Sequence, residues 1–205
     1  MSELIAENLH LWRGEQHVLR GICFELARGQ CLQIMGANGS GKTTLLRALC
    51  GLVPLEEGQV RWRGELVSGS PHGFHTQLGY LGHDNGLKPD LTALENLRFA
   101  TQLRRRAAGA QIAAALERTG VADCAAQLLR RLSAGQRRRV ALARILLTQV
   151  PLWVLDEPAA NLDPRGQSLV TELLATHVTH GGMAIVATHQ PLGLTAPQLV
   201  PMALQ

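Results

Sequence analysis

The stretch CLQIMGANGSGKTTLLRALCG, Cys31–Gly51, decides the fold of this chain. Its first residues, Cys31–Met35, form a short apolar run that predicts a buried strand. Residues 36–43 then match the pattern Gly, any four residues, Gly, Lys and Ser or Thr, which is typical of a phosphate-binding loop. Apolar residues at helical spacing follow the loop and predict a helix; they are Leu45, Leu46 and Leu49.

The chemistry of phosphate binding explains the composition of this loop. Glycines allow the backbone N–H groups to surround phosphate oxygens, where a side chain would obstruct them. The N-terminus of the following helix directs about half a positive charge toward the same oxygens. Lys42 adds a full charge that reaches the β- and γ-phosphates, and Thr43 offers a hydroxyl to Mg²⁺. A glycine-rich turn that binds nothing is the weaker interpretation, because a strand and a helix flank the loop in the required order.

The composition of the chain restricts its class. With 205 residues, 46% of them hydrophobic, the chain is expected to form a single domain with a sizeable core. An aromatic content of 3% argues against stacking platforms for single-stranded nucleic acid. The formal net charge is +4, and arginines cluster at 104–106, 130–131 and 137–139. We interpret these clusters as solvated helix faces in preference to a patch for nucleic acid or lipid headgroups.

Cysteine usage and hydropathy indicate a compartment with reduced thiols. Cys23, Cys31 and Cys50 lie in apolar surroundings and are expected to be small core residues, and the spacing of the four cysteines suggests no disulfide. Glu3 and Glu7 interrupt any apolar N-terminal run, so no signal peptide is expected. No apolar stretch approaches the ~20 residues needed to span a bilayer. Any role at a membrane is therefore expected to depend on a partner.

Strand patterns lie on both sides of the phosphate loop. Leu4–Trp12 and Val18–Leu26 alternate apolar and polar residues and predict two strands. The alternating segment Gly58–Gly64 predicts an edge strand, and Leu66–Gln77, rich in Gly, Ser, His and Pro, predicts a loop. A short apolar strand is expected at Leu78–Leu81.

Two residues near these strands have more than one interpretation from local features. Trp12 lies just before a turn, where an exposed aromatic ring can stack on a base, but a lone tryptophan is more often a packing residue. His83 lies in the flexible loop 82–86. A solvent-exposed loop histidine is favoured there over a sensor or a contact residue.

The middle of the chain changes to helical patterns. An Ala- and Arg-rich region at about 92–131 predicts a helical subdomain inserted between strands, and its first helix begins with the capping box Thr92–Glu95. A second helix is expected at Gln111–Thr119. Ser133 is a good N-cap for the helix that follows, Arg137–Leu147, with Gln136 in the capping-box position.

Carboxylates follow the next buried strand. The apolar run Leu152–Leu155 predicts a central parallel strand and ends in Asp156 and Glu157. In a phosphate-loop protein an aspartate at this position supports Mg²⁺, and the adjacent glutamate can deprotonate the attacking water. Two surface carboxylates without a function are the weaker interpretation, because the phosphate loop comes earlier in the same chain.

The last segments complete the predicted sheet. Asp163 is expected to cap a helix whose first residue is Pro164. A buried strand at Met183–Ala187 ends just before His189, which would face the crevice where ligands bind in open α/β sheets. The segment Leu199–Leu204 is expected to add a terminal strand.

Together these segments resemble the ATP-binding cassette (ABC) ATPases. The matching motifs, in the family's order, are GANGSGKTT, LSAGQ, LWVLDEP, NLD and the pair Thr188–His189. Many nucleotide hydrolases share a phosphate loop, but LSAGQ ahead of an Asp-Glu strand is close to diagnostic. The resemblance implies an α/β fold: a P-loop NTPase cassette over residues 1–205, with a mixed-sheet core, an antiparallel β edge subdomain and the inserted α-helical subdomain at about 92–131.

The resemblance also implies ATP and Mg²⁺ as cofactors and assigns catalytic roles. Glu157 would be the general base, and His189 would hold the γ-phosphate and help to position water. Thr43 and Asp156 would support Mg²⁺. Trp12 falls where the family places an aromatic ring on the adenine, which reverses the packing interpretation. The implied nucleotide-binding residues are Trp12, Gly36, Asn38, Gly39, Ser40, Gly41, Lys42, Thr43, Thr44, Ser133 and Gly135.

The family's mode of assembly implies a homodimer that forms when ATP binds. Two cassettes enclose two ATP molecules head to tail, so Ser133 and Gly135 of one copy would complete the site of the other. Asp163 would lie at that contact.

Two positions depart from the family pattern. Ala37 replaces the usual proline after the first glycine of the loop, a mild change at a position that contributes backbone. His83 stands where the family has a glutamine near Mg²⁺ and the transmembrane partner. An imidazole there would contact the metal site as donor or acceptor, and its charge would respond to pH.

Within the family, the short chain and the segment GYLGHDNGLKPDLTALENL are similar to the branch that serves bacterial cytochrome c maturation. That resemblance implies integral-membrane permease subunits as partners, a role in handling haem, and a peripheral position on the cytoplasmic face of the inner membrane. No nucleic-acid partner is expected. Three alternatives stay open: an exporter of another cargo such as a drug or lipid, a non-transport cassette acting on nucleic acid or ribosomes, and a nucleotide switch with weak turnover.

Overall fold

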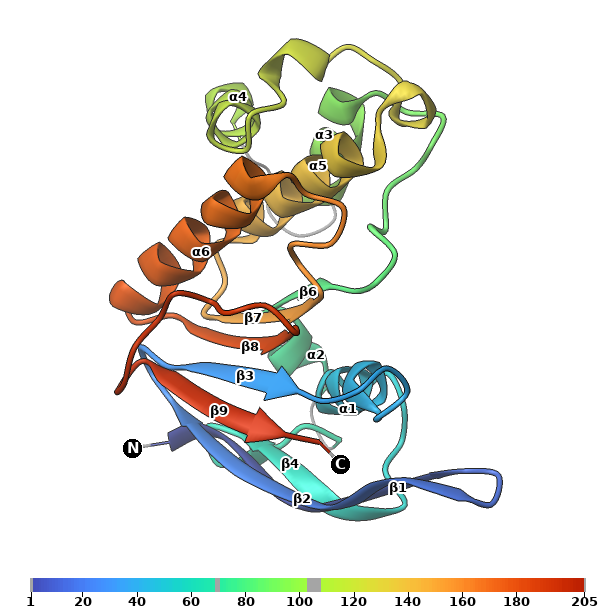
Figure 1. Cartoon of the computed structure of the whole chain (residues 1–205). Coiled ribbons are helices and arrows are strands. Elements are labelled where there is room, and N and C mark those ends of the chain that lie inside the picture. Colours follow the sequence, from blue (N-terminus) through green and yellow to red (C-terminus); the bar gives the residue numbers. More distant parts are fainter. Residues whose placement is uncertain (1, 69–70, 103–107, 205) are drawn as a thin grey trace. The chain divides into compact units, whose positions relative to one another are not determined.

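The computed structural model describes residues 2–68, 71–102 and 108–204 (Figure 1). The chain divides into two compact units. The first, here the core unit, contains Met1–Tyr80, Val150–Glu157 and Leu173–Gln205. The second, here the helical unit, contains Leu81–Gln149 and Pro158–Glu172.

A five-stranded sheet carries the phosphate loop. Its strand order is β6–β7–β8–β3–β9, and β3 pairs in parallel with both β8 and β9 (Figure 1). Every residue of β7 and of β8 is buried, as expected for strands whose two faces are both covered. The predicted strands are thereby confirmed. Their bounds are Leu78–Leu81 for β6, Leu152–Asp156 for β7, Met183–Ala187 for β8, Cys31–Met35 for β3 and Leu199–Ala203 for β9.

A second, antiparallel sheet has the strand order β2–β1–β4–β5, with bounds Gln16–Ala27, Ser2–Arg13, Glu57–Trp62 and Glu65–Leu66. The prediction of an edge strand at 58–64 was wrong, because β4 lies between β1 and the two-residue strand β5. The expected loop at 66–77 is also interrupted by the short helix α2, Pro71–His75.

Helix α1, Lys42–Leu49, lies between the two sheets (Figure 1). Its leucines belong to one apolar core with side chains from both sheets, among them Leu4 and Leu32. Burying a leucine side chain contributes about 1.5–3 kcal/mol, so this helix holds the sheets together through its apolar side chains. The leucines whose spacing predicted this helix, Leu45, Leu46 and Leu49, are each no more than 1% exposed.

The cysteine predictions were partly right. Cys31 and Cys50 are buried, and burial raises the pKa of each thiol to about 12, which makes them inert. Cys23, however, is exposed. It lies on β2 between Ile22 and Phe24, which pack against the core, so strand alternation directs its side chain to the other face.

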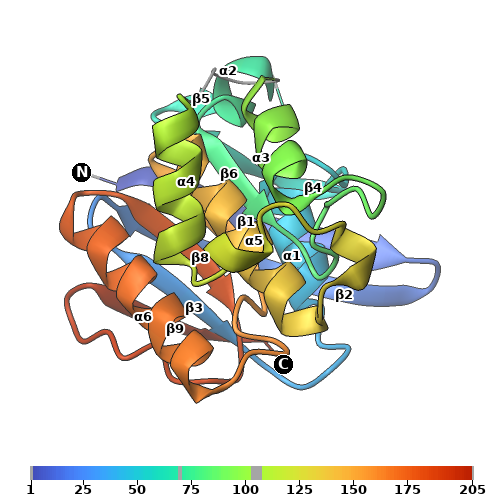
Figure 2. The same ribbon diagram turned by 90° about the horizontal axis from the view of Figure 1, so that it is seen from above.

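The helical unit has a core of its own. Helices α3 (Ala93–Gln102), α4 (Gly109–Arg118) and α5 (Ala134–Thr148) pack together, and two short 3₁₀ helices, Ala122–Cys124 and Leu129–Arg131, connect α4 to α5 (Figure 2). The core contains Leu97, Ile112, Leu116 and Val140. Helix α6, Pro164–Thr179, begins in the helical unit and ends in the core unit.

The predicted start of α3 is confirmed. The Glu95 carboxylate accepts hydrogen bonds from the backbone N–H and the hydroxyl of Thr92, and the Thr92 hydroxyl accepts one from the Glu95 N–H. These bonds satisfy N–H groups that the first turn leaves unpaired. Part of the predicted helical insertion, 103–107, lies outside the described residues.

A half-buried histidine in the core unit makes stability depend on pH. The ring of His177 stacks on Trp153 with 3.8 Å between centroids, and its Nε2 lies 3.1 Å from the Met183 carbonyl oxygen. A carbonyl only accepts, so Nε2 donates. Burial holds the pKa of His177 below its ordinary value of 6.5, against the opposing effect of its backbone hydrogen bonds.

We therefore expect the free energy of unfolding to fall as the pH drops below about 6.5. Below this pH the unfolded chain binds a proton at His177 that the folded chain does not. The stabilisation that comes from the neutral His177 is therefore complete above about pH 6.5 and is lost as the pH falls below it. The slope for one proton is at most about 1.4 kcal/mol per pH unit. Denaturant titrations between about pH 5 and about pH 8 measure it. His177→Gln should flatten this slope, whereas the exposed control His180→Gln should not; an unchanged slope in His177→Gln would contradict the assignment.

Candidate active site

The loop between β3 and α1 has a backbone that requires glycine. Gly36, Gly39 and Gly41 have φ of 156°, 84° and 95°. A Cβ at Gly36 would lie 2.7 Å from the Leu204 carbonyl oxygen, and one at Gly41 would lie 2.8 Å from a methyl group of Val18. The loop can therefore curve closely around a ligand only with these residues.

Lys42, the first residue of α1, is buried, with only 8% of its surface exposed. Its Nζ donates to the carbonyl oxygens of Gly36, at 2.7 Å, and Ala37, at 2.9 Å, and lies 3.2 Å from Nε2 of His189. An ammonium group has three N–H donors and no acceptor, so Nε2 of His189 accepts in this contact. The lysine is thus held inside the loop, and the histidine is brought to it.

Two oxygen ligands suited to a magnesium ion meet beside the loop. The Thr43 hydroxyl donates to Oδ2 of Asp156 over 2.7 Å. The aspartate, at the end of β7, is buried to 2% exposure. Mg²⁺ prefers hard oxygen ligands at 2.0–2.1 Å in octahedral geometry, and adjacent ligands are then about 3 Å apart. The spacing of the two oxygens therefore fits one Mg²⁺ coordination sphere.

The described residues contain no cluster of three or more His, Cys, Asp or Glu side chains that could hold a metal. In nucleotide sites Mg²⁺ usually takes most of its ligands from phosphate and water.

Glu157 directly follows Asp156 in the chain and has an unusual backbone conformation. Its φ is 45°, and its N–H donates to the Ala187 carbonyl oxygen at 2.8 Å. A positive φ is strained for a residue with a side chain, and such strain persists only where neighbouring bonds hold the segment. Oε1 of Glu157 lies 3.6 Å from Nε2 of His189. One imidazole nitrogen thus lies near both the lysine and the glutamate.

Other loop residues differ in exposure. Asn38 and Gly39 are exposed, whereas Thr44 is buried. The Ser40 hydroxyl is buried and has no hydrogen-bond partner in the described part of the chain. A buried hydroxyl without a partner is costly, which is consistent with a ligand that supplies one.

Trp12 is half-buried and lies in a stack of rings. It pairs with His17 across β1 and β2, and the two rings are 3.9 Å apart at an angle of 6°. The ring of His10 also stacks on Trp12, and its Nδ1 lies 2.9 Å from Nε2 of His17. The two histidines beside Trp12 have no counterpart among the residues predicted from the sequence, although strand alternation places His10 and Trp12 on one face of β1. Contact of Trp12 with adenine stays a prediction.

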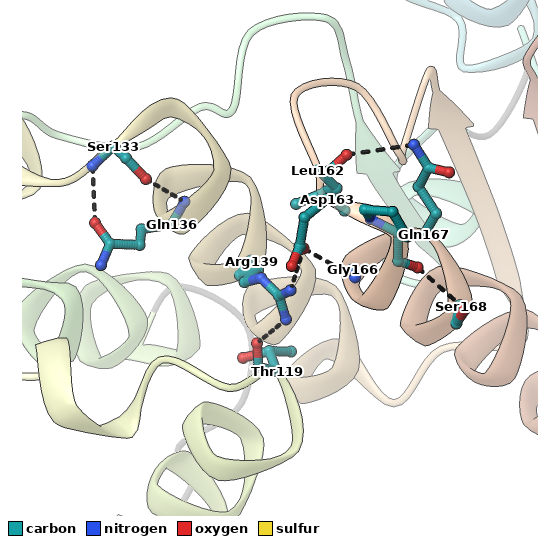
Figure 3. Close-up of polar contacts among 10 residues, drawn as sticks. Thr119, Ser133, Gln136, Arg139, Leu162, Asp163, Gly166, Gln167 and Ser168 are labelled. Carbon is teal, nitrogen blue, oxygen red and sulfur yellow. Dashed lines mark hydrogen bonds and ion pairs between the residues drawn. The ribbon is translucent and has the colours of Figure 1, made fainter.

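Two further predicted residues, Ser133 and Asp163, lie in the helical unit, each with its own polar contacts (Figure 3). Ser133 caps α5 as predicted: its hydroxyl accepts from the Gln136 N–H at 3.1 Å, and the Gln136 side chain accepts from the Ser133 N–H at 2.8 Å. Gly135, in the first turn, has no room for a side chain, since a Cβ would lie 2.9 Å from the Asn161 carbonyl oxygen.

Asp163 caps α6 as predicted, because its Oδ1 accepts from the Gly166 N–H at 3.0 Å (Figure 3). The same oxygen accepts from the Arg139 guanidinium at 2.8 Å, and Arg139 also donates to the Thr119 carbonyl oxygen. The Arg139 hydrogen bond, together with that from Gly166, holds the pKa of Asp163 below its ordinary value. The role of Asp163 at a dimer contact stays a prediction.

The interpretation of the arginines at 137–139 as a solvated face was wrong for Arg138, which is only 3% exposed. The signal was present in the spacing, because Arg138 shares one face of α5 with Ala141, Leu142 and Ile145. All three of these apolar residues are buried.

His83, by contrast, is exposed in the bend after β6, within the helical unit. Imidazole is a less suitable ligand for Mg²⁺ than carboxylate or water, so its proposed metal contact rests on the resemblance alone. No helix in the described residues is both long and apolar enough to cross a bilayer.

Comparison with known proteins agrees with these motifs. Residues 19–160 match the family model described as "ABC transporter". A relative from Methylococcus capsulatus, "Cytochrome c biogenesis ATP-binding export protein CcmA", is 48% identical over 93% of each chain. A relative of the same description, numbered 1, from Salmonella paratyphi A is 43% identical over 98% of this chain and 96% of its own. A solved structure, a putative ABC transporter ATP-binding protein from Pyrococcus furiosus, shares the fold with a TM-score of 0.85, 23% identity and coverage of 98% and 96%.

Proposed function

Because this chain belongs to the ABC transporter family, we propose that it is the ATP-hydrolysing subunit of an export complex that serves the biogenesis of c-type cytochromes. ATP is its nucleotide, and it works with membrane permease subunits, as ATP-binding subunits of this family do. Hydrolysis converts ATP and water to ADP and phosphate.

One observation carries the catalytic part of this proposal. At the carboxyl ends of the parallel strands β3, β7 and β8, His189 contacts both Lys42 and Glu157, and Thr43 contacts Asp156. Asp156 and Glu157 are adjacent in the chain, so the backbone joins the two sets of contacts into one network. Ligands bind at this edge of open α/β sheets. In the network, Lys42 supplies positive charge, Thr43 and Asp156 supply metal ligands, and Glu157 lies next to them in sequence.

The loop residues bind and orient the phosphates. The N–H groups of the glycine-rich loop and the start of α1 face the phosphate oxygens. A charged phosphate is a stronger acceptor for Lys42 than the neutral carbonyls of Gly36 and Ala37. Thr43 and Asp156 would hold Mg²⁺, which neutralises charge on the β- and γ-oxygens when bound.

Glu157 and His189 act on the water. The Glu157 carboxylate accepts a proton from a water molecule that lies in line with the γ-phosphorus. Nε2 of His189 lies 3.6 Å from Oε1 of Glu157, and it donates to the γ-phosphate once it no longer accepts from Lys42. An imidazole can do this only with a proton on Nε2, so nucleotide binding would place a proton on that nitrogen.

The site is completed by a second copy of the chain. In the proposed closed dimer, the α5 N-terminus of one copy, with Ser133 and Gly135, faces the γ-phosphate bound by the other copy. Ser133 is exposed, and its helix starts with a positive dipole end suited to an anion. Repulsion between the charged products then reopens the dimer.

The assignment to this branch of the family rests on two relatives named for cytochrome c biogenesis export. They are 43–48% identical to this chain over more than nine-tenths of each chain. We propose that the complex either exports haem or drives the release of a haem chaperone. The chain is peripheral, on the cytoplasmic face of the bacterial inner membrane, and reaches the membrane through permease subunits.

Genetic complementation tests this function. A bacterial strain that lacks its own ATP-binding subunit for cytochrome c maturation should regain covalently haem-stained c-type cytochromes when it expresses this chain, but not when it expresses Lys42→Met. Membrane pull-down of the tagged chain should recover the cytochrome c maturation subunits. Recovery of a different permease, with no restored haem staining, would overturn the cytochrome assignment and leave the ATPase assignment standing.

A further inference from the structure

Arg138, on α5, is a buried cation with defined partners. Its Nε donates to the Pro158 carbonyl oxygen at 3.2 Å. Its Nη1 donates to the Gly82 carbonyl oxygen and to Oδ1 of Asn85, both at 3.0 Å. All four residues lie in the helical unit. Three hydrogen bonds from one guanidinium thus join three segments that are distant in the sequence.

One joined segment follows the proposed base, and the other carries the histidine that departs from the family pattern. Pro158 directly follows Glu157, and Gly82 and Asn85 lie on either side of His83 and Asp84. Arg138 therefore holds the chain one residue after the proposed base and, at the same time, the loop that carries the unusual histidine.

The backbone of Glu157 makes the first of these bonds important. Its φ of 45° is unfavourable for glutamate and must be maintained by its neighbours. The Glu157 N–H is held by Ala187 on one side. On the other side, the Pro158 carbonyl is held by Arg138.

The neighbouring arginine has a different task. Arg139 donates to Thr119 and to Asp163, which are residues at a helix end and a helix start. Arg138 instead presents two edges of its planar fork to two loops, a geometry that the single nitrogen of lysine cannot reproduce. The difference suggests that Arg138 transmits position between the loops.

We propose that Arg138 is a positioning residue that couples the loop around His83 to the turn after Glu157, so that the place of the Glu157 carboxylate depends on the conformation of that loop. The proposal rests on the proposed function, since it needs Glu157 as the base. It predicts an effect on kcat alone, because Arg138 does not belong to the phosphate loop.

Arg138→Lys tests the proposal because it keeps the charge and loses the fork. We expect kcat for ATP to fall about 10- to 100-fold, the range that a misplaced catalytic group produces, with KM and ATP affinity within about twofold of the wild type. Arg118→Met, which removes an exposed arginine of the same unit, should change none of these values. Thermal unfolding identifies any variant that fails to fold.

A double-variant comparison separates positioning from a general structural effect. In a Glu157→Gln background the base is already absent, so Arg138→Lys should lower single-turnover hydrolysis less than about twofold. Asn85→Ala, which removes one of the two loop acceptors of Arg138 and leaves the Gly82 carbonyl, should lower kcat in the wild-type background and have no effect in the Glu157→Gln background. Equal losses in both backgrounds, or a loss from Arg138→Lys with none from Asn85→Ala, would overturn the coupling. Full activity of Glu157→Gln alone would instead overturn the assignment of Glu157 as the base, on which the coupling rests.

Discussion

Replacing Glu157 with glutamine is expected to lower ATP turnover about 10²- to 10⁴-fold, the contribution typical of a general base. Glutamine has the shape of glutamate and accepts hydrogen bonds, but it cannot take a proton from water at neutral pH. The contacts of Lys42 with the loop and of Thr43 with Asp156 do not involve Glu157, so ATP affinity should stay near the wild-type value. Steady-state phosphate release and equilibrium nucleotide binding measure the two quantities.

The control is Glu65→Gln, which makes the same chemical change at an exposed position on β5. It should leave turnover unchanged. Because Glu157→Gln binds ATP without cutting it, this variant should also accumulate the closed dimer. Turnover at the wild-type rate in Glu157→Gln would remove Glu157 from the mechanism.

Replacing Ser133 with arginine is expected to abolish ATP-driven dimerisation while sparing ATP binding by the monomer. Ser133 is exposed at the N-cap of α5, where the proposed partner copy presents its γ-phosphate. A long side chain at this position would separate two closely packed surfaces, whereas the phosphate loop of the same copy does not include Ser133. Light scattering in the presence of ATP, performed in the Glu157→Gln background, measures the dimer.

The control variant Ser133→Ala separates the effect of a bulky side chain from the effect of losing the helix cap. Both variants lose the hydroxyl that accepts from the Gln136 N–H, which costs about 0.5–2 kcal/mol of stability. Both should therefore show a lower melting temperature, but only Ser133→Arg should remain monomeric with ATP; Ser133→Ala should still dimerise, more weakly. If Ser133→Arg dimerised at the same ATP concentrations as the protein with Ser133, the head-to-tail arrangement would be contradicted.

The sequence alone predicted the elements whose causes are local. The strand, glycine loop and helix around Lys42 follow from apolar spacing and backbone requirements that are visible within one stretch. The same is true of the capping boxes at Thr92 and Ser133 and of the buried strand before Asp156. The contact between Thr43 and Asp156 could also be anticipated, because parallel strands bring their carboxyl ends to one edge of the sheet.

Other features depended on parts of the chain that are distant in the sequence. Whether β4 is an edge strand depends on its neighbours β1 and β5, and alternation within the strand does not determine them. Arg138 was assigned to the surface by its charge, although its spacing placed it on the buried face of α5. Its partners at Pro158 and Gly82 could not be found from local patterns. The ring stack of Trp12 and His17 likewise depends on the register of two strands.

The two separate cores have a practical consequence for spectroscopy. All three tryptophans of the sequence, Trp12, Trp62 and Trp153, and its single tyrosine, Tyr80, belong to the core unit. Intrinsic fluorescence will therefore report the melting of that unit and will be almost blind to the α3–α5 bundle, which far-ultraviolet circular dichroism detects strongly. If the two optical signals change at different denaturant concentrations, the cassette unfolds in two steps, and a tryptophan introduced into α4 would make the silent step visible.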